Sequence, residues 1–245
     1  MISLNDKTIL IVGGGSGIGR AIAEESSALG ADVIIASRSK DKLRTVAAEI
    51  GSNVQTSPMD MTDEDDVKVW AAALPTIDYL VISASSAVHA PFASSETAPL
   101  RHMFDAKFFG PYVTAREVIP KMRSGGAIML FSGVLSRRPG QNCSGLGAVN
   151  GAVEAMTRGM ALELGPDVRV NCMSPGMVRS EAYSELDDNT REAMYKSTGE
   201  SLPVGRVGFA KEIAHAVIAS LTNGYLTGQI IDVDGGHMIR QYVAR

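Results

Sequence analysis

The chain has 245 residues, of which 45% are hydrophobic and 20% are charged, and its formal net charge is −4. This ordinary globular composition excludes an intrinsically disordered chain, and the acidic balance disfavours DNA or RNA as a partner. Two cysteines exclude a disulfide framework, and they form no cluster with metal-ligand spacing.

No apolar run approaches the length of a membrane span, and the first residues lack the basic and apolar regions of a signal peptide. We therefore expect a cytoplasmic protein that binds neither membrane nor nucleic acid and holds no metal.

Short apolar runs typical of strands alternate with helix-length stretches. The predicted strands are Thr8–Val12, Asp32–Ala36, Asn53–Ser57, Tyr79–Ser83, Ala127–Phe131, Arg169–Met173 and Ile230–Val233. The predicted helices are Gly17–Leu29, Lys40–Ile50, Leu100–Met122, Leu146–Leu164 and Ala210–Leu221. Strands that are apolar throughout suit a sheet covered on both faces. The alternation predicts one doubly wound α/β domain over residues 1–245, with a parallel sheet and helices on both faces.

The stretch 179–205 interrupts this alternation. It is polar, it has only a weak helical pattern, and it carries Glu181, Glu185, Asp187 and Asp188. Long irregular insertions at such a place are often lids, so we expect a lid on the substrate side.

The first predicted strand runs directly into a glycine-rich turn, Gly13-Gly-Gly-Ser-Gly-Ile-Gly19, which opens a helix. Its spacing is G-x-x-x-G-x-G. Glycines let the backbone approach a pyrophosphate closely, and the helix N-terminus supplies unpaired N–H groups. The pattern predicts a dinucleotide site, and the alternative is a turn that only permits close packing. The predicted cofactor contacts here are Gly13, Ser16, Gly17, Ile18 and Gly19.

The second predicted strand ends in Ala36-Ser37-Arg38. A carboxylate here would hold the ribose 2′-hydroxyl of NAD, and none is present. The guanidinium of Arg38 suits a 2′-phosphate instead, and Ser37 offers a hydroxyl donor. The pattern favours NADP(H); the alternative is that Arg38 is a solvated charge at the start of the next helix.

Further segments match one known pattern in order along almost the whole chain. They are Asp60-Met-Thr-Asp63, Val170-Asn-Cys-Met-Ser-Pro-Gly176, Pro203-Val-Gly-Arg-Val-Gly208, Tyr225-Leu-Thr-Gly-Gln229 and Asp234-Gly-Gly236. With the glycine turn, they make the chain resemble a short-chain dehydrogenase/reductase.

The resemblance implies a Rossmann-type domain with a seven-stranded parallel sheet that binds a nicotinamide cofactor. It implies that Asp60 and Met61 meet the adenine and that Ser180 lies near the phosphates. The remaining cofactor contacts that it implies are Ala84, Asn150, Pro175, Gly176 and Val178.

The family's catalytic positions depart from the family's pattern. Its asparagine, serine, tyrosine and lysine fall on Lys107, Gly133, Leu146 and Asn150. Leucine has no proton to give and asparagine carries no charge, so the usual proton-transfer groups are missing. Replacement donors could be Lys107 or His89, against a solvated helix lysine and an ordinary loop histidine as alternatives.

Other residues could meet the substrate. Arg137 and Arg138, with Asn142 and Cys143, could clamp an anionic substrate, or the arginines could be a basic pair on the surface. Tyr183 opens the predicted lid and could reach the site.

Three functions follow from this mixed pattern. The first is an NADP(H)-dependent oxidoreductase that acts on a small carbonyl or alcohol with an atypical active site. The second is a non-catalytic NADP(H)-binding scaffold or partner subunit, and the third is a lyase or isomerase on the same fold. The resemblance also implies a homo-oligomer, a dimer or a homotetramer, whose helix Leu146–Leu164 offers a face of small residues: Ala148, Ala152, Ala155 and Gly159.

Overall fold

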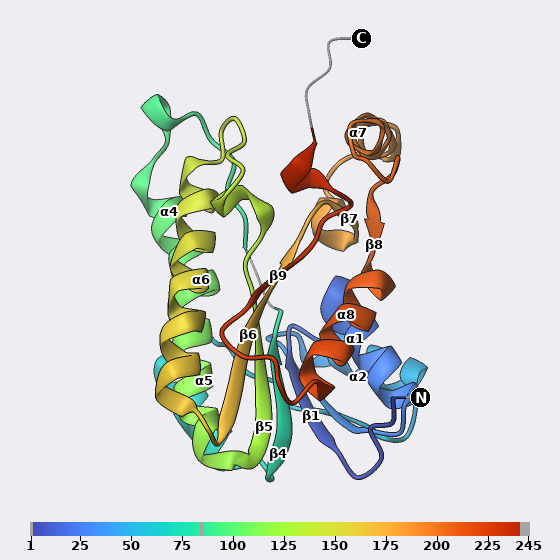
Figure 1. The fold of residues 1–245 in the computed structure, drawn as a ribbon, viewed down its shortest axis with the longest axis vertical. Coiled ribbons are helices and arrows are strands. Elements are labelled where there is room, and N and C mark those ends of the chain that lie inside the picture. The colour runs from blue at the N-terminus through green and yellow to red at the C-terminus, as the bar shows by residue number, and fades with distance from the viewer. Residues whose placement is uncertain (1, 84–85, 241–245) are drawn as a thin grey trace.

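The computed structural model of the chain describes residues 2–83 and 86–240. Seven parallel strands form one sheet in the order β3-β2-β1-β4-β5-β6-β9 (Figure 1). The strands are β1 (Thr8–Val12), β2 (Asp32–Ala36), β3 (Val54–Thr56), β4 (Ile77–Ile82), β5 (Met122–Phe131), β6 (Val168–Pro175) and β9 (Ile230–Val233). Strand β1 pairs with β2 on one side and β4 on the other, so the strand order reverses at this point. The predicted doubly wound parallel sheet is confirmed.

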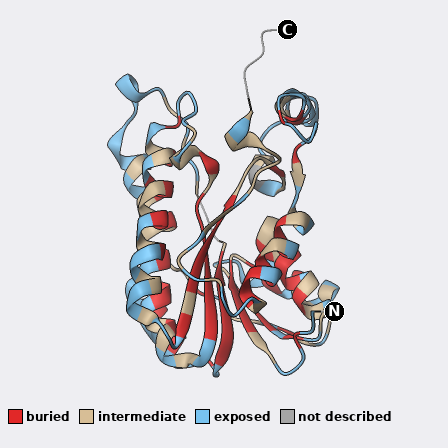
Figure 2. Cartoon of the chain, viewed as in Figure 1, coloured by how far each residue is buried: buried red, intermediate tan, exposed pale blue. Residues whose placement is uncertain are grey.

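Helices cover both faces of the sheet (Figure 1). One face packs against α1 (Gly17–Ala28), α2 (Lys40–Ile50) and α8 (Ala210–Thr222). The other packs against α3 (Glu64–Ala72), α5 (Gly110–Val118) and α6 (Ser144–Leu164). Figure 2 shows the buried residues concentrated in the strands between the two helix layers.

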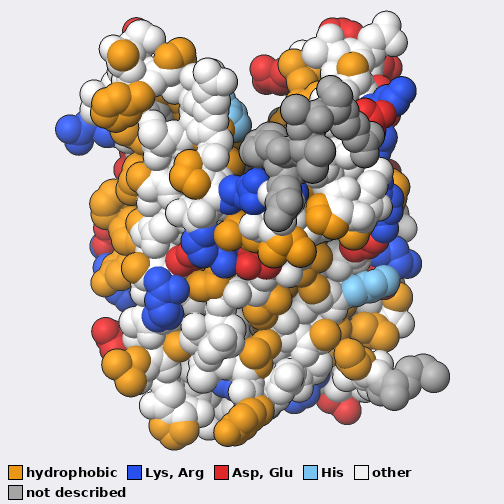
Figure 3. Space-filling view, turned by 45° about the horizontal axis from the view of Figure 1, so that its top comes forward, with side chains coloured by type: hydrophobic (Ala, Val, Ile, Leu, Met, Phe, Trp, Pro, Cys, Tyr) orange, Lys and Arg blue, Asp and Glu red, His pale blue; other side chains and the backbone are white. Residues whose placement is uncertain are grey.

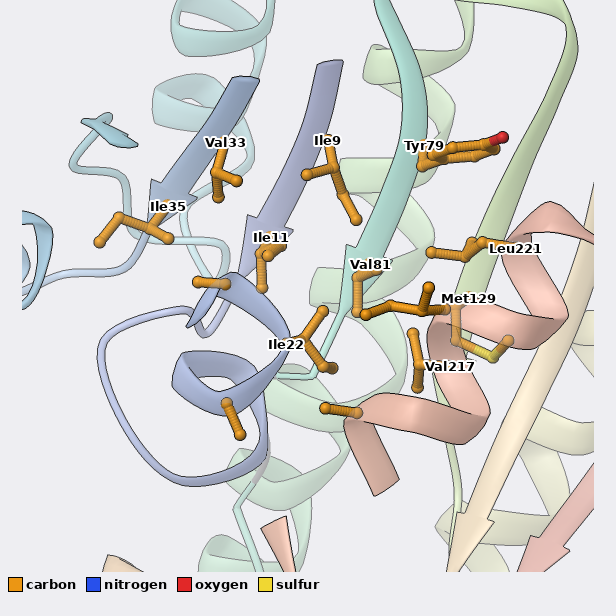
Figure 4. Packing of buried hydrophobic residues seen from close by; sticks show 14 of the residues in the cluster. Ile9, Ile11, Ile22, Val33, Ile35, Tyr79, Val81, Met129, Val217 and Leu221 are labelled. Carbon is orange, nitrogen blue, oxygen red and sulfur yellow. The ribbon is translucent and has the colours of Figure 1, made fainter. Parts of the chain in front are cut away.

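Side chains of each strand alternate between the two helix layers. Ile9 and Ile11 of β1 lie on the same side as Ile22 of α1 and Val217 of α8 (Figure 4). Leu10 belongs to the opposite core. Because both faces are dry, each such side chain contributes about 1.5–3 kcal/mol by leaving water. This burial explains why the strands read as continuous apolar runs.

The predicted helix Leu100–Met122 is divided. It consists of α4 (Thr97–Phe104), a π-helical turn η2 (Asp105–Phe109), α5 and a short 3-10 turn η3 (Ile119–Lys121), and Met122 already begins β5. Pro111 has no N–H to donate to the carbonyl of Lys107, so the regular α-helical bonding must change there. Proline therefore accounts for the interruption that the apolar pattern did not predict.

The stretch 179–205 contains a helix that its sequence pattern hardly indicates. Helix α7 (Asp188–Glu200) starts at an Asp187 cap, whose carboxylate accepts from the N–H of Thr190 over 3.0 Å. Its periodicity is weak because only Tyr195 and Gly199 are buried. The segment begins at β7 (Val178–Arg179), which pairs with β8 (Gly208–Phe209) after it. It therefore stands as a structured arm at one end of the sheet (Figure 1). The apolar pattern also did not predict helix α3.

Within residues 2–83 and 86–240, no helix is long and apolar enough to cross a membrane. In the same ranges, no group of three or more His, Cys, Asp or Glu side chains could hold a metal ion.

Candidate cofactor and active site

A cleft of about 440 Å³ opens at the carboxyl ends of β1, β2 and β4. This is where the strand order reverses, which is the usual ligand site of an open α/β sheet. The predicted cofactor contacts that line it are Gly13, Ser16, Gly17, Ile18, Gly19, Ser37, Arg38, Asp60 and Met61. Ser180 lines it from the 179–205 segment, and His102 and Ala106 from α4 and the π turn. Figure 3 shows that this end of the molecule is hollowed between the part that holds α4 and α6 and the part that holds α7.

The glycine turn brings bare backbone to this cleft. Gly13 and Gly17 have φ of +89° and +53°, which disfavour any side chain. A Cβ at Gly19 would overlap the carbonyl oxygen of Gly13 and lie 2.5 Å from Ser83 Oγ. Among the described residues, the Ser16 side chain caps none of the first N–H groups of α1. The start of α1 thus offers backbone donors to an anion.

Two cations flank the other end of the cleft. Arg38 and Lys42 are exposed there, beside the hydroxyl of Ser37. Burial opposes ionisation of the Asp60 carboxyl. Bonds from the N–H and the hydroxyl of Thr62, with the nearby charges of Arg38 and His102, outweigh that burial and lower the pKa of Asp60. The bonds are 3.0 and 2.7 Å long. Positive charge at this position suits a phosphate better than a ribose hydroxyl.

Some predicted contacts lie away from this cleft lining. Pro175 ends β6 and pairs with Val233 of β9. Gly176 is needed for packing, since a Cβ would lie 2.8 Å from the Cα of Asp234, and Val178 is buried in β7. Ala84 lies outside the described residues.

Lys107 is buried rather than solvated. It lies in the π turn with 5% of its surface exposed, and its Nζ donates to the carbonyl of Ser132 over 3.3 Å. Burial lowers the pKa of Lys107 to about 8. The alternative of a solvated helix lysine is therefore wrong.

Asn150 reaches the neighbouring carbonyl from α6. Its Nδ2 donates to the carbonyl of Gly133 over 3.3 Å, and its buried Oδ1 accepts no hydrogen bond from the described residues. A Cβ at Gly133 would lie 3.1 Å from that Nδ2. The absence of a side chain at Gly133 thus lets Asn150 approach the turn.

A buried carboxylate, Glu154, occupies the far side of this turn. Its Oε1 accepts from Ser132 Oγ over 3.1 Å and from Ser136 Oγ over 2.5 Å, and Arg137 Nε lies 3.5 Å away. The hydroxyl of Ser132 is therefore turned to the core. We did not predict Glu154, because it appeared as an ordinary polar position of a helix.

The two arginines before α6 are held within the chain. Arg137 donates to Asp232 of β9 over 2.8 Å and to Ser174 over 3.0 Å. Arg138 donates to the carbonyls of Met238 and Arg240 over 3.1 and 2.6 Å. These bonds join the loop before α6 to β6, β9 and the residues after β9, although Arg137 remains exposed; the substrate clamp stays a prediction.

Leu146 lies in a small apolar cluster instead of at a polar site. It is 7% exposed and packs with Met103 and Val149. A side chain in this environment only fills space.

Two titratable side chains, His89 and Cys143, meet in the loops after β4 and before α6. His89 Nδ1 lies 3.3 Å from Cys143 Sγ, and the two loops are joined by a bond from the N–H of Ala90 to the carbonyl of Asn142 over 2.9 Å. Burial raises the pKa of the Cys143 thiol. Burial, with Tyr195 and then Cys143 as neighbours, also raises the pKa of Tyr183. The ring of Tyr183, from the 179–205 segment, contacts the ring of Tyr195 edge-on with centroids 5.8 Å apart.

Comparison with known proteins covers nearly the full chain. The sequence model of a family described as enoyl-(acyl carrier protein) reductase matches residues 13–238. A 3-oxoacyl-[acyl-carrier-protein] reductase of Rickettsia bellii is 29% identical over 98% of this chain and all of its own. A peroxisomal 2,4-dienoyl-CoA reductase of Danio rerio is 32% identical over 95% of this chain and 82% of its own.

The chain belongs to the short-chain dehydrogenase/reductase family.

A solved structure of the same fold is a small-chain dehydrogenase in complex with NADPH. It is 33% identical to this chain, with a TM-score of 0.80, and the match covers 95% of this chain and 98% of that one. The resemblance places the family's asparagine, serine, tyrosine and lysine at four positions of this chain. At those positions, Lys107 and Asn150 donate hydrogen bonds to backbone carbonyls of one turn. Gly133 is part of that turn, and Leu146 packs in the apolar cluster.

Proposed function

We propose that this protein is an NADP(H)-dependent oxidoreductase that acts on a small carbonyl or alcohol. The observation that carries the proposal is the composition of the cleft at the sheet's switch point. In this cleft, the glycine turn leaves no room for a Cβ at Gly19. Arg38 and Lys42 stand where an NAD site would have a carboxylate. The NADPH bound to the related dehydrogenase supports the same cofactor.

The residues present fit this cofactor. The N–H groups at the start of α1 would hold its pyrophosphate, and Arg38 with Ser37 would hold its 2′-phosphate. The buried Oδ1 of Asn150 would accept a hydrogen bond from a hydroxyl group of the cofactor. When bound, the nicotinamide supplies or accepts a hydride.

Reduction of a carbonyl also needs a proton at oxygen, and His89 is the best placed donor. It is exposed, its Nδ1 is held by Cys143, and Nε2 is then the nitrogen that can meet a substrate. Tyr183 is a weaker acid because burial raises its pKa. Lys107 has a suitable pKa but is buried against the carbonyl of Ser132, so it acts as a nearby positive charge. His89 therefore replaces the missing tyrosine.

A titration of the purified protein with NADPH and NADH, followed by nicotinamide fluorescence, tests the cofactor. NADPH should bind at least about tenfold more tightly, because a bond to a charged group contributes about 1.5–3 kcal/mol. Arg38→Asp should reverse the preference, whereas Arg44→Asp on α2, which does not line the cleft, should keep it. Equal binding of both cofactors, or binding of neither, would contradict the proposal.

Turnover is tested by NADPH oxidation against a panel of small ketones, aldehydes and 3-oxoacyl thioesters. His89→Phe should lower the rate about 10²–10⁴-fold, while Tyr183→Phe should leave a substantial rate. If the wild-type protein binds NADPH but none of the carbonyl compounds causes its oxidation, the non-catalytic scaffold replaces this proposal. The burial of Leu146 at the family's tyrosine position favours that second candidate.

We also propose a cytoplasmic homo-oligomer, a dimer or tetramer. The support is the exposed outer face of α6, where Ala148, Ala155 and Gly159 are exposed and Leu162 is 85% exposed.

A further inference from the structure

The carboxylate of Glu181 lies on the glycine turn of the cofactor cleft. The N–H of Gly17, the first residue of α1, donates to Glu181 Oε2 over 2.7 Å. A Cβ at Gly17 would lie 3.5 Å from this oxygen and 3.5 Å from Cβ of Ser180. Because 164 residues separate the two partners, the tertiary structure brings this acid to the turn.

The start of α1 is the place where a dinucleotide's pyrophosphate would bind. Backbone N–H groups and the positive end of the helix dipole attract an anion there, whichever molecule supplies it. A carboxylate and a phosphate cannot both accept from the Gly17 N–H, and their like charges repel. Glu181 already satisfies this donor.

We infer that Glu181 is an internal competitor of the cofactor, so that NADP(H) must displace it to bind. The inference rests on the proposed function, because it describes the regulation of the same site. A ligand that needs a displaced segment binds with an affinity reduced by the fraction of molecules in which the segment has moved.

The same short turn connects the cofactor cleft to the substrate side. Glu181 and Tyr183 are the two ends of the 3-10 turn η5 (Glu181–Tyr183). The ring of Tyr183 contacts the ring of Tyr195 edge-on with centroids 5.8 Å apart. Because Glu181 and Tyr183 share this turn, a displacement of Glu181 that moves the turn also repositions Tyr183.

The structure also limits how far the displacement can spread. Arg179, just before the turn, donates to Glu192 of α7 over 2.8 Å and lies 4.7 Å from the ring of Tyr195. These contacts tie β7 to α7 on one side of Ser180. The movement is therefore confined to the turn, and the arm need not unfold.

The test compares the affinity for NADPH of the wild type, Glu181→Gln and Glu185→Gln, by nicotinamide fluorescence. Both variants remove one negative charge from the same exposed segment, but only the first changes the acid that accepts from Gly17. Glu181→Gln should bind NADPH about 5–20-fold more tightly, because an amide is a weaker acceptor than a carboxylate and does not repel phosphate. Glu185→Gln should stay within about twofold of the wild type.

Inorganic pyrophosphate, titrated by calorimetry, probes the same N–H groups without the nicotinamide. Tighter pyrophosphate binding by Glu181→Gln would support the inference even if NADPH bound to no variant, which would remove only the proposed function. Equal NADPH affinities of the wild type and Glu181→Gln would overturn the inference and leave the function intact. Weaker binding by Glu181→Gln would also overturn it, since the acid would then assist the cofactor. Failure of both probes with every variant would overturn both.

Discussion

Lys107 and Asn150 approach one turn of the chain from two different helices. They donate to the carbonyls of Ser132 and Gly133, each over 3.3 Å. Where the family resemblance places asparagine and lysine, this chain has lysine and asparagine. The exchange keeps one cation and one amide at the same turn while moving the charge to the opposite helix.

Replacement of Lys107 by Met tests the burial of its charge. The unfolded chain keeps this proton up to pH about 10.5, but the folded chain keeps it only up to about 8. The unfolded state therefore binds more protons between these values, and this residue makes the free energy of unfolding rise with pH across them, by about 3 kcal/mol in all.

The measurement is urea unfolding of wild type and Lys107→Met at pH values from 7 to about 10.5. Wild type should gain stability relative to the variant as the pH rises. Burial raises the pKa of Cys172 to about 11, so this thiol acts in the opposite direction in both proteins, and the charge of Lys107 lowers its pKa slightly in the wild type. Parallel curves for the two proteins would show that the lysine is not buried as a charge.

At the scale of the element, an apolar pattern predicts that a helix is present but not where its hydrogen bonding is interrupted. The apolar pattern of residues 100–122 predicts one helix, yet a π turn divides it and points Lys107 into the protein. Pro111 was visible in the sequence, but its effect depends on how the helix packs. A close contact adds to it, since a Cβ at Gly110 would lie 2.9 Å from the carbonyl of Met61.

Two helical glycines allow a matched test of the glycine turn. Gly19→Ala in α1 places a methyl group against the backbone of Gly13 and against Ser83, so we expect loss of NADPH binding and lower stability. Gly151→Ala in α6 has nothing within 4 Å among the described residues, so we expect a gain of about 0.5–1 kcal/mol. Thermal unfolding and the NADPH titration measure both effects. Normal NADPH affinity in Gly19→Ala would mean that the turn tolerates a side chain and is not a tight cradle.

At the scale of the whole molecule, α6 has one face in the core and one in solvent. Val149 and Val153 are buried, whereas Ala155 and Gly159 on the other side are exposed and small enough for close helix contact. Leu162 continues this apolar face. A second copy of the chain would cover it.

Light scattering tests this assembly. The protein should have a mass of two or four times 25.9 kDa, and Ala155→Arg should shift it toward the single chain, because a buried unpaired charge opposes the contact. Ala28→Arg, the same substitution at an exposed position of α1 on the other side of the sheet, serves as control. A wild type with the mass of one chain would refute the assembly.

The amino-acid pattern alone predicted the parallel sheet, the glycine turn and a basic residue, Arg38, in place of an acid after the second strand. These follow from local pattern, because strands buried on both faces are apolar throughout and a turn without side chains needs glycine. It also showed that Leu146 has no proton to give. The environment of the polar groups depends on how the chain folds. In the folded chain, Lys107 and Glu154 are buried and His89 contacts Cys143. Glu181 accepts a hydrogen bond from the N–H of Gly17. Each of these depends on contact between segments far apart in the chain, and burial and hydrogen bonding, which set the charge and reach of a side chain, arise only from such contacts.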